Sequence, residues 1–115
     1  LVAVSRLGAS TIFDCALPTR DARRYRLFRF TGEPLDTTGS FWKYTYLLDE
    51  DHAGDNGPVD ETCDGPCCTR YSRAYIHHLA RIKDPLGLRL STLHNLRFYA
   101  RLVQMLRDER AGSLA

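Results

Sequence analysis

Three cysteines and one histidine form the most distinctive chemical pattern in the sequence. Cys63, Cys67 and Cys68 lie close together in CDGPCC, and His94 follows in a later helical pattern. Thiolates and an imidazole are ligands that Zn²⁺ prefers in closed tetrahedral sites. The spacing is not CxxC…CxxC, so free thiols beside a histidine that caps a helix would also fit the residue types.

Two helical segments must carry these side chains. The periodicity predicts one helix from Thr69 to Lys83, and a second that begins near Ser91 or Thr92 and frays beyond Arg107. The expected buried residues are Tyr71, Ala74, Tyr75, His78, Leu79 and Ile82 in the first helix, and Leu93, Leu96, Ala100, Val103 and Leu106 in the second.

His94 would lie in the first turn of the second helix. There it can present one ring nitrogen to a metal while the other bonds a nearby acceptor. His77 and His78 are poorer ligand candidates, because adjacent helical side chains point about 100° apart.

The composition is that of one globular unit. The chain has 115 residues, of which 43% are hydrophobic and 26% charged, and its net charge is +2. No apolar run approaches the ~20 residues that span a bilayer, and no signal-peptide pattern opens the chain, so we expect no membrane partner. Four cysteines without a secretory signal favour metal binding or free thiols, and indicate a cytoplasmic protein.

The beginning of the chain has the pattern of an α/β barrel. Residues 1–8 read as the end of a helix, residues 10–16 as a buried strand, and a loop rich in Pro, Thr and Arg follows. A full barrel needs many more strands than this chain can hold. We therefore expect an α/β fold (α+β as an isolated fragment), with residues 1–26 as the last strand-helix portion of a TIM barrel in a larger enzyme.

Asp14 lies where the predicted strand ends. The C-terminal ends of barrel strands carry the chemistry, so this carboxylate is a candidate nucleophile or base. By position alone it is also compatible with a structural role, since most strand-end aspartates cap turns or pair with arginine.

A dense group of arginines follows Asp14. Guanidinium groups suit the phosphate oxygens of RNA, although a solvated face balanced by acidic neighbours is the simpler explanation of the charges. The arginines are Arg20, Arg23, Arg24, Arg26 and Arg29, and the acidic neighbours are Asp21, Glu33 and Asp36.

Residues 27–115 predict a second unit, with a small antiparallel sheet and the two C-terminal helices. Residues 27–36 read as a hairpin with a turn at 31–33, and residues 41–48 as another alternating strand. Residues 49–61 are acidic and rich in turn formers, which predicts a mobile loop.

Several of these segments resemble the tRNA-guanine transglycosylase family. YSRAYIHHL (71–79) and LGLRLSTLHNLRFYARL (86–102) are similar to its C-terminal part, where bacterial members have a CxCxxC cluster, YSRAY-HHL and TIHNL. FDCALPTRDAR (13–23) is similar to the family's FDCVLPTRNAR. The resemblance covers roughly residues 1–32 and 58–108, with a divergent middle.

The resemblance implies an activity and the residues that perform it. The family exchanges guanine at the wobble position of tRNA for a 7-deazaguanine base, which is preQ1 in bacterial queuosine biosynthesis. The aspartate of FDC is its covalent nucleophile and matches Asp14, and the arginines of LPTR-AR contact the anticodon loop and match Arg20 and Arg23. The family is usually homodimeric, and its cysteines and histidine hold one structural zinc.

The metal cluster departs from the family pattern at one position. Cys63 and Cys68 match the first and third cysteines, Gly65 occupies the second, and Cys67 is additional. The shell that we favour from sequence is Cys63, Cys67, Cys68 and His94. The alternative is Cys63, Cys68 and His94, with water or without a stable metal.

Two functions remain open at this point. The chain is either the nucleophile strand and zinc-binding subdomain of a transglycosylase, or a non-catalytic zinc-stabilised module that binds RNA or a subunit. The intact FDC motif favours the first. The family's base-recognition residues precede the matching part, so we expect residues 1–115 alone not to exchange bases.

Overall fold

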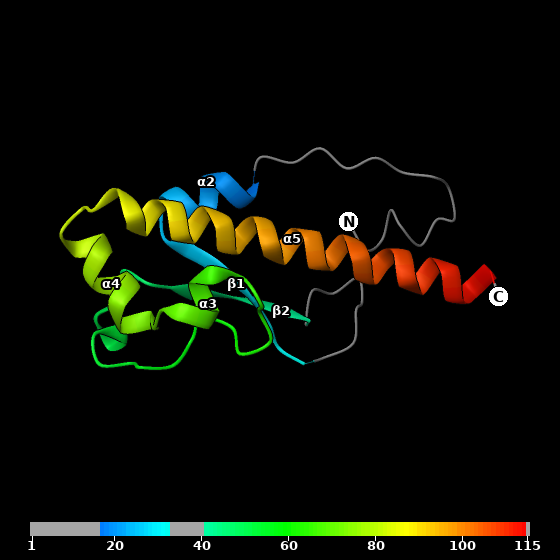
Figure 1. The fold of residues 1–115 in the computed structure, drawn as a ribbon, viewed down its shortest axis with the longest axis horizontal. Helices are drawn as coiled ribbons and strands as arrows, with labels where there is room; N and C mark the ends of the chain where they lie inside the picture. Colours follow the sequence, from blue (N-terminus) through cyan, green and yellow to red (C-terminus); the bar gives the residue numbers. More distant parts are fainter. Residues whose placement is uncertain (1–16, 33–40, 115) are drawn as a thin grey trace.

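The computed structural model of the chain describes residues 17–32 and 41–114. In chain order the elements are α2 (Leu17–Arg23), β1 (Arg26–Phe30), β2 (Trp42–Tyr46), the 3₁₀ helix η1 (Glu50–His52), α3 (Pro66–Arg70), α4 (Arg73–Arg81) and α5 (Pro85–Leu114). The other elements gather around the first half of α5, and its second half extends beyond them (Figure 1). The described part is therefore α+β, in agreement with what was expected for the fragment.

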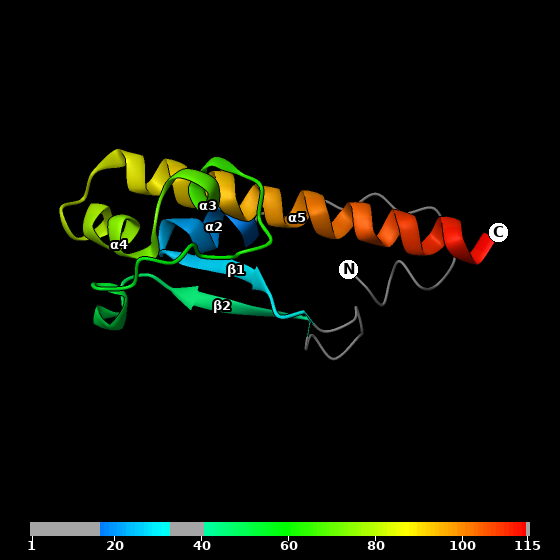
Figure 2. The same cartoon turned by 60° about the horizontal axis from the view of Figure 1, so that its bottom comes forward.

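The sheet has two antiparallel strands and packs against α5. Phe28 of β1 lies opposite Tyr44 of β2, and the two strands run side by side under the long helix (Figure 2). Aromatic residues favour such half-buried strands. The ring of Phe28 lies 5.1 Å from that of Phe98 on α5 and 5.3 Å from that of Trp42. The contact with Phe98 fixes the sheet to the helix, and the contact with Trp42 joins the two strands.

The segment from 17 to 23, which was expected to be a loop, is the helix α2. Its buried side includes Pro18, Asp21 and Ala22, while Arg20 and Arg23 are exposed. The helix ends where Tyr25 takes a left-handed conformation, with φ at 57°, and turns the chain into β1. The predicted barrel strand with Asp14, and the return strand of the hairpin near 34–36, lie outside the described residues.

The single helix predicted for 69–83 is two helices. Tyr71 is extended between α3 and α4, and Ser72 caps α4 by accepting a hydrogen bond from the backbone of Tyr75. The predicted inward face was wrong at most positions: Leu79 is buried as expected, but Tyr75 and Ile82 are 39% and 56% exposed. The buried residues of α4 are Ile76, His77, Leu79 and Ala80.

The last helix begins earlier and ends later than the sequence predicted. Asp84 accepts a hydrogen bond from the backbone of Leu86, so the chain is capped and helical from Pro85 onward, and it continues to Leu114. Its buried face is Leu90, Ser91, His94, Asn95, Phe98, Leu102 and Leu106. Leu93 and Leu96, which were expected inside, are 39% and 46% exposed. In the described residues no helix combines the length and apolar character needed to cross a bilayer.

The acidic loop from 49 to 61 is attached to α4, in contrast to the expectation of a mobile segment. The backbone nitrogens of Arg73 and Ala74 donate to the carbonyls of Gly57 and Asp55, both at 2.8 Å. The guanidinium of Arg73 also lies 3.1 Å from the carboxylate of Asp55. Its acidic residues thus form turns and ion pairs that hold the loop against the helix.

Candidate metal centre

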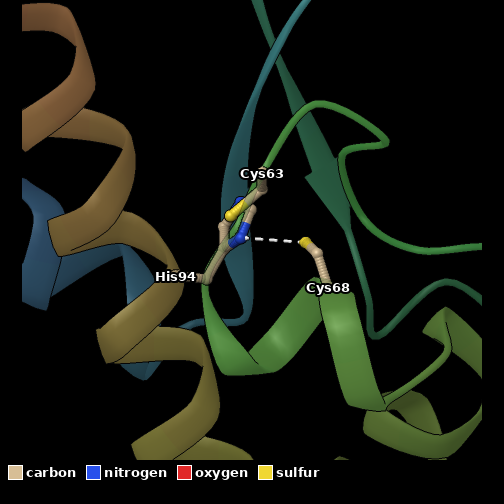
Figure 3. A group of neighbouring side chains, drawn as sticks. All are labelled: Cys63, Cys68 and His94. Atoms are coloured by element: carbon tan, nitrogen blue, oxygen red, sulfur yellow. Dashed lines mark hydrogen bonds between the residues drawn. The ribbon is translucent and has the colours of Figure 1, made fainter.

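Cys63, Cys68 and His94 meet in one cluster. Their ligand atoms all lie within 4.8 Å of one another, and Cys68 Sγ is 3.3 Å from His94 Nδ1. Figure 3 shows the three side chains converging from the loop before α3, from α3 and from α5. In a tetrahedral zinc site, bonds of about 2.0–2.3 Å separate neighbouring ligands by roughly 3.5–3.8 Å. The donor set therefore fits zinc with small adjustments.

The ring of His94 is oriented for this role. Its Nε2 lies 2.5 Å from the carbonyl oxygen of Phe28, and His94 is only 1% exposed. A carbonyl accepts hydrogen bonds and cannot donate them, so Nε2 carries the proton and Nδ1 presents its lone pair to the sulfurs. The sequence analysis expected a nearby acceptor for the other ring nitrogen of His94, and the carbonyl of Phe28 is that acceptor.

The turn into α3 brings the two cysteines together. Gly65 is the cap of α3, Pro66 begins the helix, and Cys68 donates its backbone N–H to the carbonyl of Gly65. The backbone nitrogen of Gly65 in turn donates to Cys63 Sγ at 3.4 Å. This tight turn places Cys63 and Cys68 on the same side of the loop.

Gly65 lies directly beside the cluster. A Cβ atom at this position would lie 3.5 Å from Cys63 Sγ and 3.6 Å from Cγ of Arg97, which are ordinary contact distances. Its φ of −75° is accessible to any residue. A side chain at position 65 would therefore begin in contact with Cys63 Sγ, without backbone strain.

Cys67, the fourth ligand that we favoured from sequence, has different surroundings. It is fully buried in an apolar cluster with Leu27, Leu47 and Ile76. Its thiol still hydrogen-bonds that of Cys68. The structure thus brings together Cys63, Cys68 and His94, while coordination by Cys67 stays a prediction.

Both thiols of the cluster hold their protons strongly. The hydrogen bond with Cys68, together with burial, raises the pKa of Cys63 to about 12. For Cys68 the hydrogen bond with Cys63 lowers the pKa, but the hydrogen bond with Cys67 and burial outweigh it and raise the pKa to about 11. Zinc binding must therefore displace two thiol protons at neutral pH.

Asn95, next to the histidine, is a structural residue that the sequence reasoning missed. It is fully buried, and its Nδ2 donates to the carbonyls of Pro18 and Arg26, each at 3.0 Å. Its Oδ1 accepts from the backbone nitrogen of Phe28 at 3.1 Å. The available signal was a polar residue on the inward face of an amphipathic helix, which normally requires buried partners.

Side chains satisfy the edge of β1 that faces away from β2. His94 and Asn95 bond both backbone groups of Phe28, and Asp60 accepts from the nitrogen of Phe30 at 2.8 Å. Backbone groups on a strand edge need partners, and here these side chains take the place of a third strand. The candidate metal ligand His94 thus also caps an edge of the sheet.

Most of the chain matches a known protein family. The family described as Queuine tRNA-ribosyltransferase matches residues 2–111. The chain belongs to this family. The resemblance seen in the cysteine, YSRAY and FDC segments is thereby confirmed.

Curated members of the queuine tRNA-ribosyltransferase family give the extent of the match. The chain is 43% identical over 108 residues to a queuine tRNA-ribosyltransferase of Idiomarina loihiensis. The matched segment covers 94% of this chain and 26% of that protein. It is 42% identical over 104 residues to one from Pseudoalteromonas translucida, covering 90% of this chain and 25% of that protein. The chain therefore spans about a quarter of the length of these relatives.

The arginines that the family resemblance assigned to RNA lie on the outer side of α2. Arg20 and Arg23 are exposed, and Asp21 between them turns inward to accept the Tyr44 hydroxyl at 2.7 Å. Burial, with the hydrogen bond to Asp21, raises the pKa of Tyr44 to about 12, so the hydroxyl stays a donor. Asp21 is thus engaged with the sheet, whereas its arginine neighbours face solvent.

Proposed function

We propose that this chain is the C-terminal part of a tRNA-guanine transglycosylase that replaces guanine at the wobble position of tRNA with a 7-deazaguanine base such as preQ1. The observation that carries the proposal is the family match over residues 2–111, which includes the FDC segment and the cluster of Cys63, Cys68 and His94. On the same basis we propose a cytoplasmic homodimer that acts in queuosine biosynthesis.

Asp14 is the nucleophile of the proposed reaction. One of its carboxylate oxygens forms a bond to C1′ of the guanosine, and the bond from C1′ to N9 of guanine breaks, so that guanine leaves with the electron pair and takes up a proton. The 7-deazaguanine base then attacks C1′ through its deprotonated ring nitrogen and releases the Asp14 carboxylate. Two displacements at one carbon retain the anomeric configuration, as in retaining glycosidases.

The exposed arginines of α2 hold the RNA near that nucleophile in this proposal. Arg20 and Arg23 follow Asp14 closely in sequence and present their guanidinium groups to solvent. Guanidinium groups suit the phosphate oxygens of an anticodon loop. The inward orientation of Asp21, which accepts the hydroxyl of Tyr44, supports this role, because the exposed face of α2 then carries Arg20 and Arg23.

Zinc has a structural role in the proposal. Cys63, Cys68 and His94 would hold the ion, which would tie the loop before α3 to α5 beside the sheet. A structural site of this kind shapes the surface around it and takes no part in the bond changes at Asp14.

A trapping experiment in the complete enzyme tests the proposal. The covalent enzyme–tRNA adduct is collected under denaturing conditions, and Asp14→Asn is expected to abolish it because an amide oxygen is a poor nucleophile. Asp21→Asn is the matched control, since its amide oxygen still accepts from Tyr44 and its adduct should persist. An undiminished adduct in Asp14→Asn would remove Asp14 from this role.

The second arm of the test uses residues 1–115 alone. This part is expected not to incorporate labelled guanine into tRNA, since it spans about a quarter of its relatives. Measurable incorporation would contradict the assignment of base recognition to the rest of the enzyme.

A further inference from the structure

Two consecutive side chains of α5 hold both backbone groups of one strand residue. His94 donates from Nε2 to the carbonyl of Phe28, and Asn95 Oδ1 accepts from the backbone nitrogen of Phe28. The two residues are 1% and 0% exposed, so neither bond competes with water. A buried hydrogen bond of this kind is costly to lose, because its partner is then left unsatisfied. The position of β1 is therefore fixed by the same turn of α5 that supplies the metal ligand.

Asn95 extends this connection to α2. Its two amide hydrogens are donated to the carbonyls of Arg26 in β1 and Pro18 in α2. The orientation of the amide follows from its partners, since two carbonyls require the nitrogen and the Phe28 N–H requires the oxygen. A single buried side chain thus joins α5 to β1 and to the helix that exposes Arg20 and Arg23.

The geometry leads us to propose that Asn95 is a positioning residue that couples the metal centre to α2. A metal bound by Cys63, Cys68 and His94 fixes this turn of α5 against the loop before α3, and Asn95 passes that constraint to the carbonyl of Pro18. Metal occupancy then orders α2 from a distance, although no metal ligand lies on α2. The coupling is independent of the proposed function. Only the consequence of the coupling for RNA binding rests on the proposed function.

Hydrogen exchange of the purified protein measures this coupling. Removing zinc with a chelator should speed exchange of the amides in residues 17–25 by about tenfold, equivalent to about 1.4 kcal/mol of opening free energy. In zinc-saturated Asn95→Ala the same amides should also exchange about tenfold faster, while zinc stays near one ion per chain.

The decisive readout is whether the two effects combine. If the constraint passes through Asn95, chelation of Asn95→Ala adds little further exchange in α2, and the effects are not additive. A residue that merely stabilises the fold would give effects that multiply. The proposal would be overturned if the fold-increases in exchange from chelation and from Asn95→Ala multiplied fully, or if α2 exchange were unchanged in Asn95→Ala.

Ser91→Ala is the matched control on the same helix. Ser91 is also fully buried one turn earlier, and its hydroxyl has no hydrogen-bond partner among the described residues. This variant should keep the wild-type response of α2 to chelation. An equal loss of coupling in Ser91→Ala would mean that any change on this face of α5 has the same effect, and would overturn the specific role of Asn95.

A measurement on the unmodified protein covers the case in which Asn95→Ala does not fold. The side-chain amide protons of Asn95 are both donated to carbonyls, so they should exchange slowly with zinc bound and at least about tenfold faster after chelation. Equal protection with and without zinc would overturn the proposal.

A binding assay separates the coupling from the proposed function. With an RNA anticodon stem-loop as the probe, Asn95→Ala should bind about tenfold more weakly than the wild type at full zinc content. If the wild type itself does not bind this RNA, the proposed function fails, and the exchange experiments still decide the coupling. Equal RNA affinity of the two proteins would overturn the consequence for RNA.

Discussion

Two buried histidines make the same anchoring contact in two regions of the molecule. His94 on α5 is 1% exposed and bonds the carbonyl of Phe28, and His77 on α4 is 3% exposed and bonds the carbonyl of Leu47 at 2.6 Å. Their second ring nitrogens differ. Nδ1 of His94 faces the thiol of Cys68 at 3.3 Å, whereas Nε2 of His77 has no hydrogen-bond partner in the described residues.

The surroundings of the second nitrogen decide what each histidine can do. Among the described residues Nε2 of His77 pairs with Glu50 at 3.7 Å, and that carboxylate is 69% exposed and also paired with Arg81. One exposed carboxylate does not make a closed metal site, whereas two thiols and an imidazole fit one. Burial and a bond to the backbone are therefore common to both histidines, and only the facing donors distinguish a ligand from a structural residue.

Replacing each histidine with alanine should give the largest difference between the two regions, which is a difference in zinc content. His94→Ala should lose zinc almost completely, because the cluster keeps only two thiols. His77→Ala should keep about one zinc per chain and lose roughly 1–3 kcal/mol of unfolding free energy, since the Leu47 carbonyl is left without its partner. Metal analysis and urea unfolding measure the two effects. Retention of zinc by His94→Ala would erase the distinction between the regions.

The pH dependence of zinc binding should be the next largest effect. The pKa values of Cys63 and Cys68 are raised to about 12 and 11, so both thiols are protonated in the metal-free protein at neutral pH. Binding releases both protons, and apparent zinc affinity should fall by about a hundredfold for each pH unit of acidification. Competition with a zinc indicator between about pH 6.5 and 8 measures the slope. His77→Ala is the control and should give the same slope.

A smaller effect is expected from adding a thiol to the His94 region. In Gly65→Cys the new Cβ lies near 3.5 Å from Cys63 Sγ, so a third thiolate should join the site and tighten zinc binding. With Co²⁺ as the probe, the thiolate charge-transfer absorption should rise by about half, from two thiolates to three. Gly65→Ser is the matched control of similar size. Identical spectra for the two variants would show that position 65 does not reach the metal.

The smallest effect is expected from Glu50→Gln in the His77 region. Glu50 pairs with Arg81 and His77, and its carboxylate is largely exposed. Ion pairs with an exposed carboxylate contribute little to the free energy of unfolding in water. The variant should lose less than about 0.5 kcal/mol of unfolding free energy and keep its zinc. A loss above about 1 kcal/mol in urea unfolding would show that His77 depends on a charged partner.

Much of the metal centre was predictable because it depends on residue type. Soft thiols close together and a histidine on a helical pattern predicted Cys63, Cys68 and His94 as neighbours, and the structure brings them together. The position of Cys67 was not predictable from spacing, because the turn of α3 directs its side chain into the apolar cluster.

The inward faces of the helices were harder to predict for a physical reason. The buried face of α5 contains Ser91, His94 and Asn95, whereas apolar spacing alone indicates Leu93 and Leu96. His94 and Asn95 are buried there because they hydrogen-bond backbone groups of β1 and α2. Those partners, Phe28 and Pro18, are far away in sequence and become visible only in the fold.

The capped edge of β1 has a consequence for the order of synthesis. The groups that close it lie far downstream, since His94 is 66 residues beyond Phe28 and Asp60 is 30 residues beyond Phe30. A ribosome completes the strand well before it releases the turn of α5 that covers it. The nascent chain therefore carries an open strand edge while the next 66 residues are translated, and a stall before residue 95 would leave that edge free to recruit another chain.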